Sequence, residues 1–465
     1  MPKFELITDQ DIIKGFCTDS SNYLGYADAL IRPRSTEEVS EILREANTKK
    51  ISVTTVGNRS SLTGSAAALG GWILDTSMMT KIIDINHSDK YAIAEPGIML
   101  SEFKKQILDQ GLFYPPDPTS EKECFFGGSI ATNASGSRTF KYGSTRRYVR
   151  ALEVVLANGD ILNLRSPQIE KNTFGYLPFQ NMVDIFVGSE GTLGVITKTE
   201  VDLIPKPENF FGGMLFFTTL NEALDFVVSI RKELNNFNPI ISPRAVELFD
   251  IHGLDIIRTD SSFKIPEAAQ AAIFFEQEYS SGDKSCFEDI LKNWLSFLEG
   301  NKLLIEDTII AEQVKQQEEL RRLRHKVPSH LFEEGGNYVK DGGGKISTDW
   351  SVPVNKIHTI IDYARELANE AKIDEPVIYG HIGNGHPHYN FIAKNKDEKR
   401  KILEVVHKTC KRVVDLGGTI AAEHGIGKIK KDFIKYQYPY QIINTMKALK
   451  YSLDPNGILA PGNIF

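Results

Sequence analysis

The stretch GGSIATNASGSRTFKYG, residues 127–143, bears more directly on the fold than any other part of the sequence. It is dense in glycine and in the small hydroxyl residues serine and threonine. Glycine lets the backbone approach a ligand closely and point successive N–H groups at phosphate oxygens, and the hydroxyl residues add donors without bulk. One loop of this kind is usually only a turn, so it indicates a ligand site only if other segments share the pattern.

Three further segments in the first 200 residues resemble it in character: VGNRSSLTGSA at 56–66, PPDPTS at 115–120 and GSEGTLGVIT at 188–197. Two of these are glycine-rich loops, and the proline-rich one is a rigid turn between them. The chain has no GxGxxG motif after an initial strand and no Walker loop, which excludes a Rossmann or P-loop domain. Together the four segments predict a dinucleotide site of another kind.

The bulk properties narrow the class of protein. A length of 465 residues favours two or three domains, and a net charge of -7 argues against non-specific nucleic-acid binding. The four cysteines are far apart and include no CxxC pair, which fits a reducing compartment without disulfides or a cysteine metal site. No signal peptide and no apolar run long enough for a membrane span is apparent. We therefore expect a cytoplasmic protein, and peripheral contact with the inner membrane stays open.

Hydrophobic periodicity and turn residues predict the local structure of the N-terminal part. The segment 124–147 is expected to be an ordered loop, and a hairpin is expected around Asn158-Gly159. The predicted helices are 35–49 and 100–110, and the predicted strands are 51–56, 72–75, 91–95, 151–157 and 161–164.

A domain boundary is predicted within 206–213, beyond which strands and helices alternate in a different way. This order favours an α+β sandwich with helices on one side of a sheet. Phe274 and Phe275 are expected in the core, and the basic stretch Lys428–Lys431 at an exposed helix start. The predicted strands are 214–218, 272–279, 376–381 and 388–393, and the predicted helices are 221–234, 283–300, 354–371 and 396–416.

Two segments of the C-terminal third concentrate histidine and glutamate: YGHIGNGHPHYN at 379–390 and AEHGIG at 422–427. His381 and His388 flank a glycine turn and are therefore able to converge. Two imidazoles and a carboxylate form a common site for a divalent metal that keeps positions open for a substrate. From the residues alone, a metal site and simply packed histidines are about equally supported.

The loop motifs resemble the FAD-binding domain of the vanillyl-alcohol oxidase/p-cresol methylhydroxylase family over residues 25–205. The matching motifs are SLTGSA at 61–66, EPG at 95–97, PPDP at 115–118, GGSIATNASG at 127–136 and GSEGTLGVIT at 188–197. The C-terminal half resembles the C-terminal domain of FAD-linked oxidases, as found in D-lactate, glycolate and D-2-hydroxyglutarate dehydrogenases. Its motifs are GHIGNGHPHYN at 380–390, AAEHGIG at 421–427 and LDPNGILAPGN at 453–463.

The resemblance implies an α+β fold with a two-subdomain FAD-binding domain, an α+β substrate (cap) domain with an antiparallel sheet, and a C-terminal helical segment. The implied divisions are 1–24 as an N-terminal segment, 25–208 as the FAD-binding domain, 209–424 as the cap domain, and 425–465 as a segment returning to the FAD domain. Noncovalent FAD is expected because no histidine or cysteine stands at the usual attachment position. The residues expected to contact FAD are Gly57, Asn58, Arg59, Ser60, Ser61, Leu62, Thr63, Pro118, Thr119, Gly127, Gly128, Ser129, Thr132, Asn133, Gly136, Tyr142, Gly143, Glu190, Gly191, Gly194 and Ile196.

Carried over position by position, the resemblance implies that His381, His388 and Glu423 hold a divalent metal, zinc or manganese, and that His424 is the base. A D-2-hydroxy acid would lose its hydroxyl proton to His424 and a hydride to the flavin. Arg324 would bind the substrate carboxylate, although a solvated helix face with Arg321 and Arg322 is an equally good interpretation.

Lys345 is a weaker candidate for a catalytic residue, because it follows a glycine run expected to be a mobile, solvent-facing loop. The implied electron acceptor is a quinone, a cytochrome or an electron-transfer flavoprotein, and a homodimer stays open. Two alternatives also remain: a transferase resembling alkyl-glycerone-phosphate synthase, and a flavoprotein subunit with a degraded site.

Four positions depart from the family pattern and bear on these alternatives. Asn384 replaces the family's aspartate, His386 replaces an asparagine, and Ala460 replaces the terminal asparagine. In the first loop Arg59 stands among residues that replace glycines, where it either pairs with the pyrophosphate or points outward.

Overall fold

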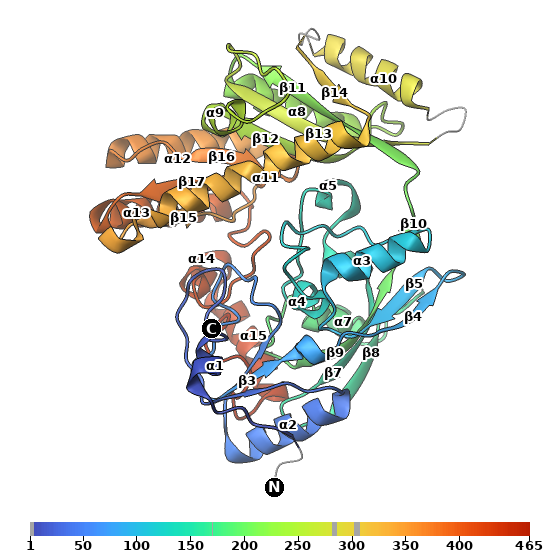
Figure 1. The fold of residues 1–465 in the computed structure, drawn as a ribbon, viewed down its shortest axis with the longest axis vertical. Coiled ribbons are helices and arrows are strands. Elements are labelled where there is room, and N and C mark those ends of the chain that lie inside the picture. The colour runs from blue at the N-terminus through green and yellow to red at the C-terminus, as the bar shows by residue number, and fades with distance from the viewer. Residues whose placement is uncertain (1–3, 170, 281–285, 302–306) are drawn as a thin grey trace. The chain divides into compact units, whose positions relative to one another are not determined.

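The computed structural model describes residues 4–169, 171–280, 286–301 and 307–465, which fall into two compact units (Figure 1). Unit 1 comprises Met1–Gly136, Gly143–Lys206 and Glu423–Phe465, and unit 2 comprises Ser137–Tyr142 and Pro207–Ala422. The short piece 137–142, from the middle of the expected FAD loop, therefore packs with unit 2. The chain also returns to unit 1 at its C-terminal end.

Besides a two-stranded sheet of β6 (Leu112–Phe113) and β10 (Ile204–Pro205), unit 1 contains two larger sheets, as expected for a domain of two subdomains. The first is parallel, with the order β1 (Ala29–Ile31), β3 (Trp72–Asp75), β2 (Val53–Val56). Helix α2 (Thr36–Lys49) covers it, begins at the N-cap Ser35, and buries Val39, Ile42 and Leu43 in the same core as Trp72. The second sheet is antiparallel, with the order β4 (Ile82–Asn86), β5 (Tyr91–Ala94), β9 (Val195–Asp202), β7 (Val149–Val155), β8 (Ile161–Arg165).

The C-terminal segment completes the first subdomain of unit 1. After helix α15 (Tyr440–Leu453), the backbone runs parallel to β2, with Val53 N donating to Ile458 O and Ala460 N donating to Val53 O. Lys450 and Asp454 form a buried ion pair beneath this turn. The last residues of the chain thus become part of the layer that carries the first predicted cofactor loop.

Unit 2 is built on a seven-stranded sheet in which every pairing is antiparallel. Its strands follow the order β14 (Ile309–Ala311), β11 (Asn209–Phe217), β13 (Ala271–Tyr279), β12 (Pro243–Asp250), β16 (Val377–Gly380), β17 (His388–Ala393), β15 (Gly344–Ser347). Strand β12, which the sequence did not predict, lies near the middle and is buried along its whole length.

Helices cover both faces of this sheet, so the expectation of helices on one side is wrong. Neighbouring residues of β13 show this, because side chains alternate between the faces of a strand. Phe275 stacks on Trp294 of α10 (Phe287–Gly300), whereas Phe274 packs with Leu320 and Leu323 of α11 (Val314–Gly336). Figure 1 shows α11 crossing the strands on that second face. The remaining large helices of unit 2 are α8 (Leu220–Leu234), α9 (Ile251–Arg258), α12 (Ile357–Ala371) and α13 (Lys396–Asp415).

The division between the two units after Lys206 falls within the predicted boundary region 206–213, in which β11 also begins. Two local expectations need correction. The segment 124–147 is not only loop, because it contains α4 (Phe126–Ala131) and α5 (Thr139–Tyr142). The start of the predicted helix 283–300 falls partly outside the described residues, and α10 begins at Phe287.

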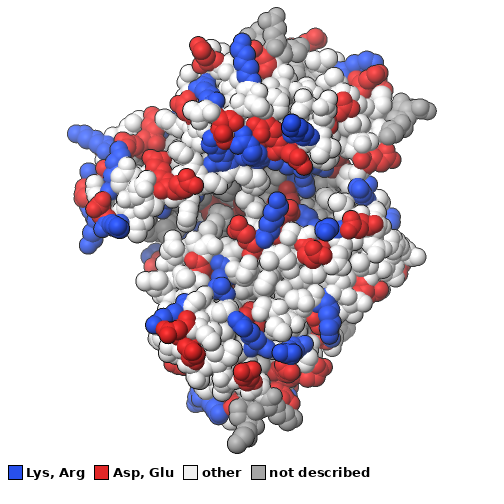
Figure 2. Space-filling view, viewed as in Figure 1, with Lys and Arg blue, Asp and Glu red and all other residues white. Residues whose placement is uncertain are grey.

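On the face shown in Figure 2, basic and acidic side chains alternate and neither sign covers a large area. Within the described parts of the chain, no helix is both long enough and apolar enough to cross a bilayer.

Candidate functional site

Three histidines converge in unit 2 at the turn between β16 and β17. His381 follows β16, and His388 begins β17 opposite Tyr379. The His388 ring lies 5.0 Å from those of His381 and His386, and the other pair is 5.6 Å apart, measured between centroids. His381 and His388 offer ligand nitrogens within 4.8 Å of each other. The turn has no room for a side chain at Gly385, because a Cβ there would lie 1.9 Å from Val352 O.

A buried carboxylate from β12 orients the first of these histidines. Glu247 is fully buried and accepts hydrogen bonds from His381 Nδ1 at 2.6 Å and Arg324 Nε at 3.0 Å. Burial alone would raise the pKa of Glu247, but the interactions with His381 and Arg324 hold that pKa below its ordinary value. With its proton on Nδ1, His381 presents the Nε2 lone pair, as a metal-binding histidine with a carboxylate behind it does.

The same contacts show where Arg324 lies. Its side chain is buried, and its Nη2 lies 3.3 Å from His381 Nε2. It therefore belongs to the histidine cluster, whereas Arg322 is exposed and pairs with Asp260 and Glu319. The interpretation of a shared solvated face is wrong for Arg324 and right for Arg322.

A second carboxylate accompanies His386. Asp349 Oδ1 lies 3.2 Å from His386 Nε2, and both side chains are buried. The backbone oxygen of Asp349 accepts a hydrogen bond from Ala422 N at 2.9 Å. Ala422 is the last residue of unit 2, so the covalent chain leads directly from this cluster into Glu423 and His424.

Lys345 lies in a strand rather than a mobile loop. Strand β15 begins at Gly344 and pairs with β17, Lys345 standing opposite Ile392. Burial lowers the pKa of Lys345 to about 8. The glycine run before Lys345 allows the backbone to pack closely, because a Cβ on Gly343 would lie 2.1 Å from Ala393 O.

In unit 1, the C-terminal segment holds two of the predicted cofactor loops together. Thr63 O accepts hydrogen bonds from Lys428 N and Ile429 N, and Thr63 Oγ1 lies 3.4 Å from His424 O. The carboxylate of Glu190 accepts from Ile426 N and Gly427 N, both at 2.7 Å. The candidate base is thus attached by its backbone to the first predicted loop.

Lys428 and Asn463 complete this junction. Lys428 Nζ donates to Gly64 O at 3.2 Å and to Asn463 Oδ1 at 2.6 Å, and Asn463 Nδ2 donates to Ser65 O and Glu190 O. Lys428 is buried, so the expectation of an exposed basic stretch is wrong for this residue. Burial lowers its pKa to about 8.

The other predicted cofactor residues shape the loops in different ways. Asn58 Nδ2 donates to Glu123 O, and Arg59 has a positive φ and places its guanidinium 4.4 Å from the Phe16 ring centroid. A Cβ on Gly136 would lie 2.1 Å from Asp117 O, whereas one on Gly128 would meet nothing within 4 Å. Space beside Gly128 leaves its backbone approachable, which fits the close approach of a cofactor.

One of the predicted cofactor residues has an unexpected partner. Tyr142 belongs to α5 in unit 2, and its hydroxyl bonds to the carboxylate of Glu278. Sequence reasoning also did not find Glu247, Asp349, Lys428 and Asn463. The only signal for Glu247 was an acidic residue inside the apolar run of β12.

Comparison with known proteins agrees with this architecture. Residues 27–165 match the family of FAD binding domains, and residues 206–464 match the C-terminal domain of FAD linked oxidases. The second match covers more than half of the chain. The chain therefore belongs to the FAD-linked oxidases and is an FAD-linked oxidoreductase, which confirms the resemblance and the cofactor class.

Individual relatives extend over nearly the whole chain. Glycolate oxidase subunit GlcD of Bacillus subtilis is 31% identical over 456 residues, covering 95% of this chain and 90% of the relative. D-2-hydroxyglutarate dehydrogenase of Stutzerimonas stutzeri is 30% identical over 468 residues, covering 99% and 96%. Among solved structures, p-cresol methylhydroxylase has a TM-score of 0.74 at 17% identity, covering 99% of this chain and 93% of that one. The predicted fold class is therefore confirmed.

Proposed function

We propose that this protein is an FAD-dependent dehydrogenase that oxidises a small D-2-hydroxy acid, of the D-lactate, glycolate or D-2-hydroxyglutarate class, to the 2-oxo acid. One observation carries the proposal. The backbone that leaves the histidine cluster at Ala422 is bonded to Asp349, and two residues later His424 is bonded to the Thr63 loop. Glu423 and His424 thus occupy the covalent link between the histidine cluster and the predicted cofactor loop.

In this proposal His381, His388 and Glu423 hold a divalent metal. Their donor set of two imidazoles and one carboxylate is that of a catalytic site which keeps open positions for a substrate. Glu247 behind His381 supports this assignment, because a carboxylate on the other ring nitrogen fixes the tautomer and orientation of a ligating histidine. When bound, the metal would polarise the substrate hydroxyl and FAD would accept the two electrons.

The remaining groups position the substrate and accept its proton. His424 is the proposed base, because a neutral imidazole takes up a proton near physiological pH. Arg324 is the proposed cation for the substrate carboxylate, because it lies beside His381 and a planar guanidinium matches the geometry of a carboxylate. Lys345 on the paired strands is a second candidate cation.

The related transferase has a similar fold and so is not separated from this proposal by architecture. Alkyldihydroxyacetonephosphate synthase has a TM-score of 0.71 at 18% identity, which supports a shared fold alone. The relatives of about 30% identity bear the names of 2-hydroxy-acid enzymes, which favours the dehydrogenase.

Anaerobic reduction of the bound flavin tests the proposal. D-lactate, glycolate and D-2-hydroxyglutarate are added in turn, and the visible flavin absorbance is followed. Bleaching by at least one of them is expected, and a metal-loaded protein that none of them reduces would overturn the proposal.

The variant His424→Asn tests the role of the base, with His87→Asn as its matched control. His87 is an exposed histidine of unit 1 that contacts Gln110. Both variants should keep the flavin spectrum, but only His424→Asn should lose substrate reduction, by about 100-fold or more. Equal reduction rates in the two variants would remove His424 from the role of base.

A further inference from the structure

Glu190 is a buried acidic residue of unit 1 with an unusual backbone conformation. Its φ of 51° lies in the left-handed region that residues other than glycine rarely adopt, and the residue is only 7% exposed. Burial raises the pKa of Glu190, although two backbone hydrogen bonds to its carboxylate oppose that rise. Backbone strain and a buried charge both cost stability, so their combination at one residue indicates a functional task at this position.

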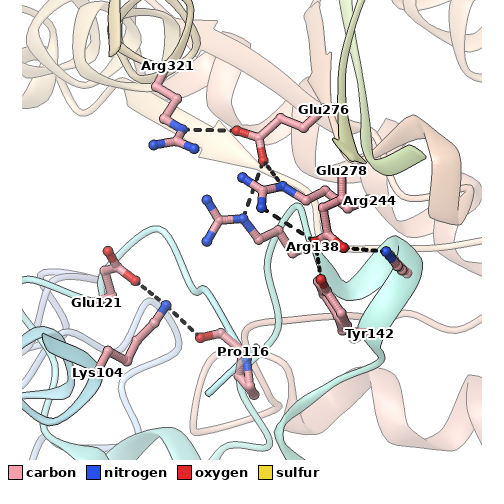
Figure 3. A network of polar contacts seen from close by, with 10 residues as sticks. Lys104, Pro116, Glu121, Arg138, Tyr142, Arg244, Glu276, Glu278 and Arg321 are labelled. Atoms are coloured by element: carbon pink, nitrogen blue, oxygen red, sulfur yellow. Dashed lines mark hydrogen bonds and ion pairs between the residues drawn. The ribbon is translucent and has the colours of Figure 1, made fainter. Parts of the chain in front are cut away.

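The carboxylate of Glu190 binds backbone rather than charged side chains. Glu276 in unit 2 shows the other arrangement, in which arginine side chains, among them Arg244 and Arg321, lie around a buried carboxylate (Figure 3). Glu190 instead accepts hydrogen bonds from the N–H groups of Ile426 and Gly427, both at 2.7 Å. Its carboxylate therefore holds a stretch of backbone in place.

The backbone that Glu190 holds is the loop directly after the proposed base, His424. Ile426 and Gly427 are two and three residues beyond His424, and successive N–H groups of this kind form a concave site for an anion. The approach is close, because a Cβ on Gly425 would lie 2.8 Å from Glu190 Oε1. A side chain at position 425 would therefore push the carboxylate out of this site.

The same loop is held at a second point by Thr63. Thr63 Oγ1 donates to His424 O at 3.4 Å, and Thr63 O accepts hydrogen bonds from Lys428 N and Ile429 N. A Cβ on Gly427 would lie 2.3 Å from Thr63 O, so this contact also requires a glycine. The backbone around His424 is thus bonded to two segments that are both expected to contact FAD.

We propose that Glu190 is a positioning residue for His424 and acts through the backbone of residues 425–427. The inference rests on the proposed function, because it concerns the base of that same site. Without the carboxylate, the N–H groups of Ile426 and Gly427 lose their acceptor and the loop that carries His424 is less firmly held. A displacement of about 1 Å in an active site can lower the rate by about 100-fold, so loss of Glu190 should slow proton removal.

Glu190→Gln tests this role, with Glu200→Gln as its matched control. Glu200 is a carboxylate of unit 1 that is 6% exposed, and it pairs with Arg165. Glutamine keeps the size of the side chain, but its NH2 group would face one of the two backbone N–H donors. The substrate is whichever of D-lactate, glycolate and D-2-hydroxyglutarate reduces the native protein. Both variants should retain FAD, and only Glu190→Gln should lower the limiting rate of flavin reduction, by about 10-fold or more, with little change in the half-saturating concentration.

A double variant separates the positioning of the base from a general structural effect. In the His424→Asn background, Glu190→Gln should lower the residual rate by less than about 2-fold, because the group that it positions is already absent. A loss of the same factor in both backgrounds, or a loss of FAD from Glu190→Gln, would overturn the proposal. Gly425→Ala is a second variant that leaves Glu190 in the chain but displaces its carboxylate. It should lower the same limiting rate, and a native rate in it would also overturn the proposal.

Hydrogen exchange of the FAD-loaded protein gives a measurement that needs no turnover. The amides of Ile426 and Gly427 should exchange about 10-fold faster in Glu190→Gln than in the native protein, because they lose a charged acceptor, and should be unchanged in Glu200→Gln. Native exchange at both amides in Glu190→Gln would refute the positioning role. Faster exchange in a protein that no hydroxy acid reduces would instead refute the proposed function and leave Glu190 as the residue that holds this loop.

Discussion

Replacing Glu247 by glutamine would change the electrostatics of the candidate site without altering the size of the side chain. Glu247 is fully buried and is the acceptor for both His381 Nδ1 and Arg324 Nε. Glutamine keeps one oxygen to accept a hydrogen bond but removes the negative charge. Arg324, 7% exposed, would then be left without that counter-charge in a buried environment.

The size of the effect follows from this burial. Breaking a buried ion pair by removing one partner costs about 3–5 kcal/mol, and the retained amide oxygen favours the lower end, about 3 kcal/mol. For a unit of this size each kcal/mol lowers Tm by about 2–4 °C, so a decrease of about 6–12 °C is expected. Loss of the carboxylate behind a ligating histidine should also weaken metal binding by about 10–100-fold.

Thermal unfolding and metal titration measure the two effects of Glu247→Gln, with Glu366→Gln as the control. Glu366 is an exposed residue of α12 in the same unit. The double variant Glu247→Gln/Arg324→Met should recover part of the lost stability, because it removes the uncompensated charge as well.

The pH dependence of stability has a definite sign. The pKa of Glu247 is lower in the folded protein than in the unfolded chain. The ionised carboxylate therefore stabilises the fold at pH values above the ordinary glutamate pKa, and this stabilisation is lost as the pH falls through the folded-state pKa. The difference between the native protein and Glu247→Gln should shrink over that acidic range. A Tm for Glu247→Gln within 2 °C of that of Glu366→Gln would refute the reasoning about a buried ion pair.

Three further variants examine the two units separately. In the folded protein the pKa of Lys428 is about 8, below the ordinary lysine value of 10.5. Between these two pH values the unfolded chain binds more protons than the folded one, so the free energy of unfolding rises with pH. Lys428→Met should lose that rise, which is at most about 1.4 kcal/mol per pH unit, in denaturant titrations at pH 7 to 10; the same dependence on pH in the variant would contradict this prediction. Gly427→Ala should lower FAD retention and stability much more than the control Gly417→Ala does. Both glycines have a positive φ, but only a Cβ on Gly427 would clash with the backbone, at 2.3 Å. Equal effects of the two variants would refute this steric argument. His388→Ala should retain less than about one-tenth of the metal bound by the exposed control His330→Ala in elemental analysis, and equal metal content would exclude His388 as a ligand.

Elements with strong local signals were predictable from the sequence. Helix α2 begins where Ser35 caps it, and β3 matches the predicted strand at Trp72–Asp75. Such elements depend on neighbouring residues, which a single sequence contains. Strand β12 was missed because both of its faces are buried, so the alternation of apolar and polar residues that identifies a half-buried strand is absent.

In the candidate site, too, contacts between residues near in sequence were predictable and contacts between distant residues were not. His381 follows β16 and His388 begins the paired strand β17 only seven residues later, so the motif itself brings them together. Glu247 lies 134 residues from His381, and no local pattern indicates that contact. Tyr142 is a further case: the family resemblance implied a cofactor contact for it, and in the structure its hydroxyl bonds to Glu278, 136 residues away.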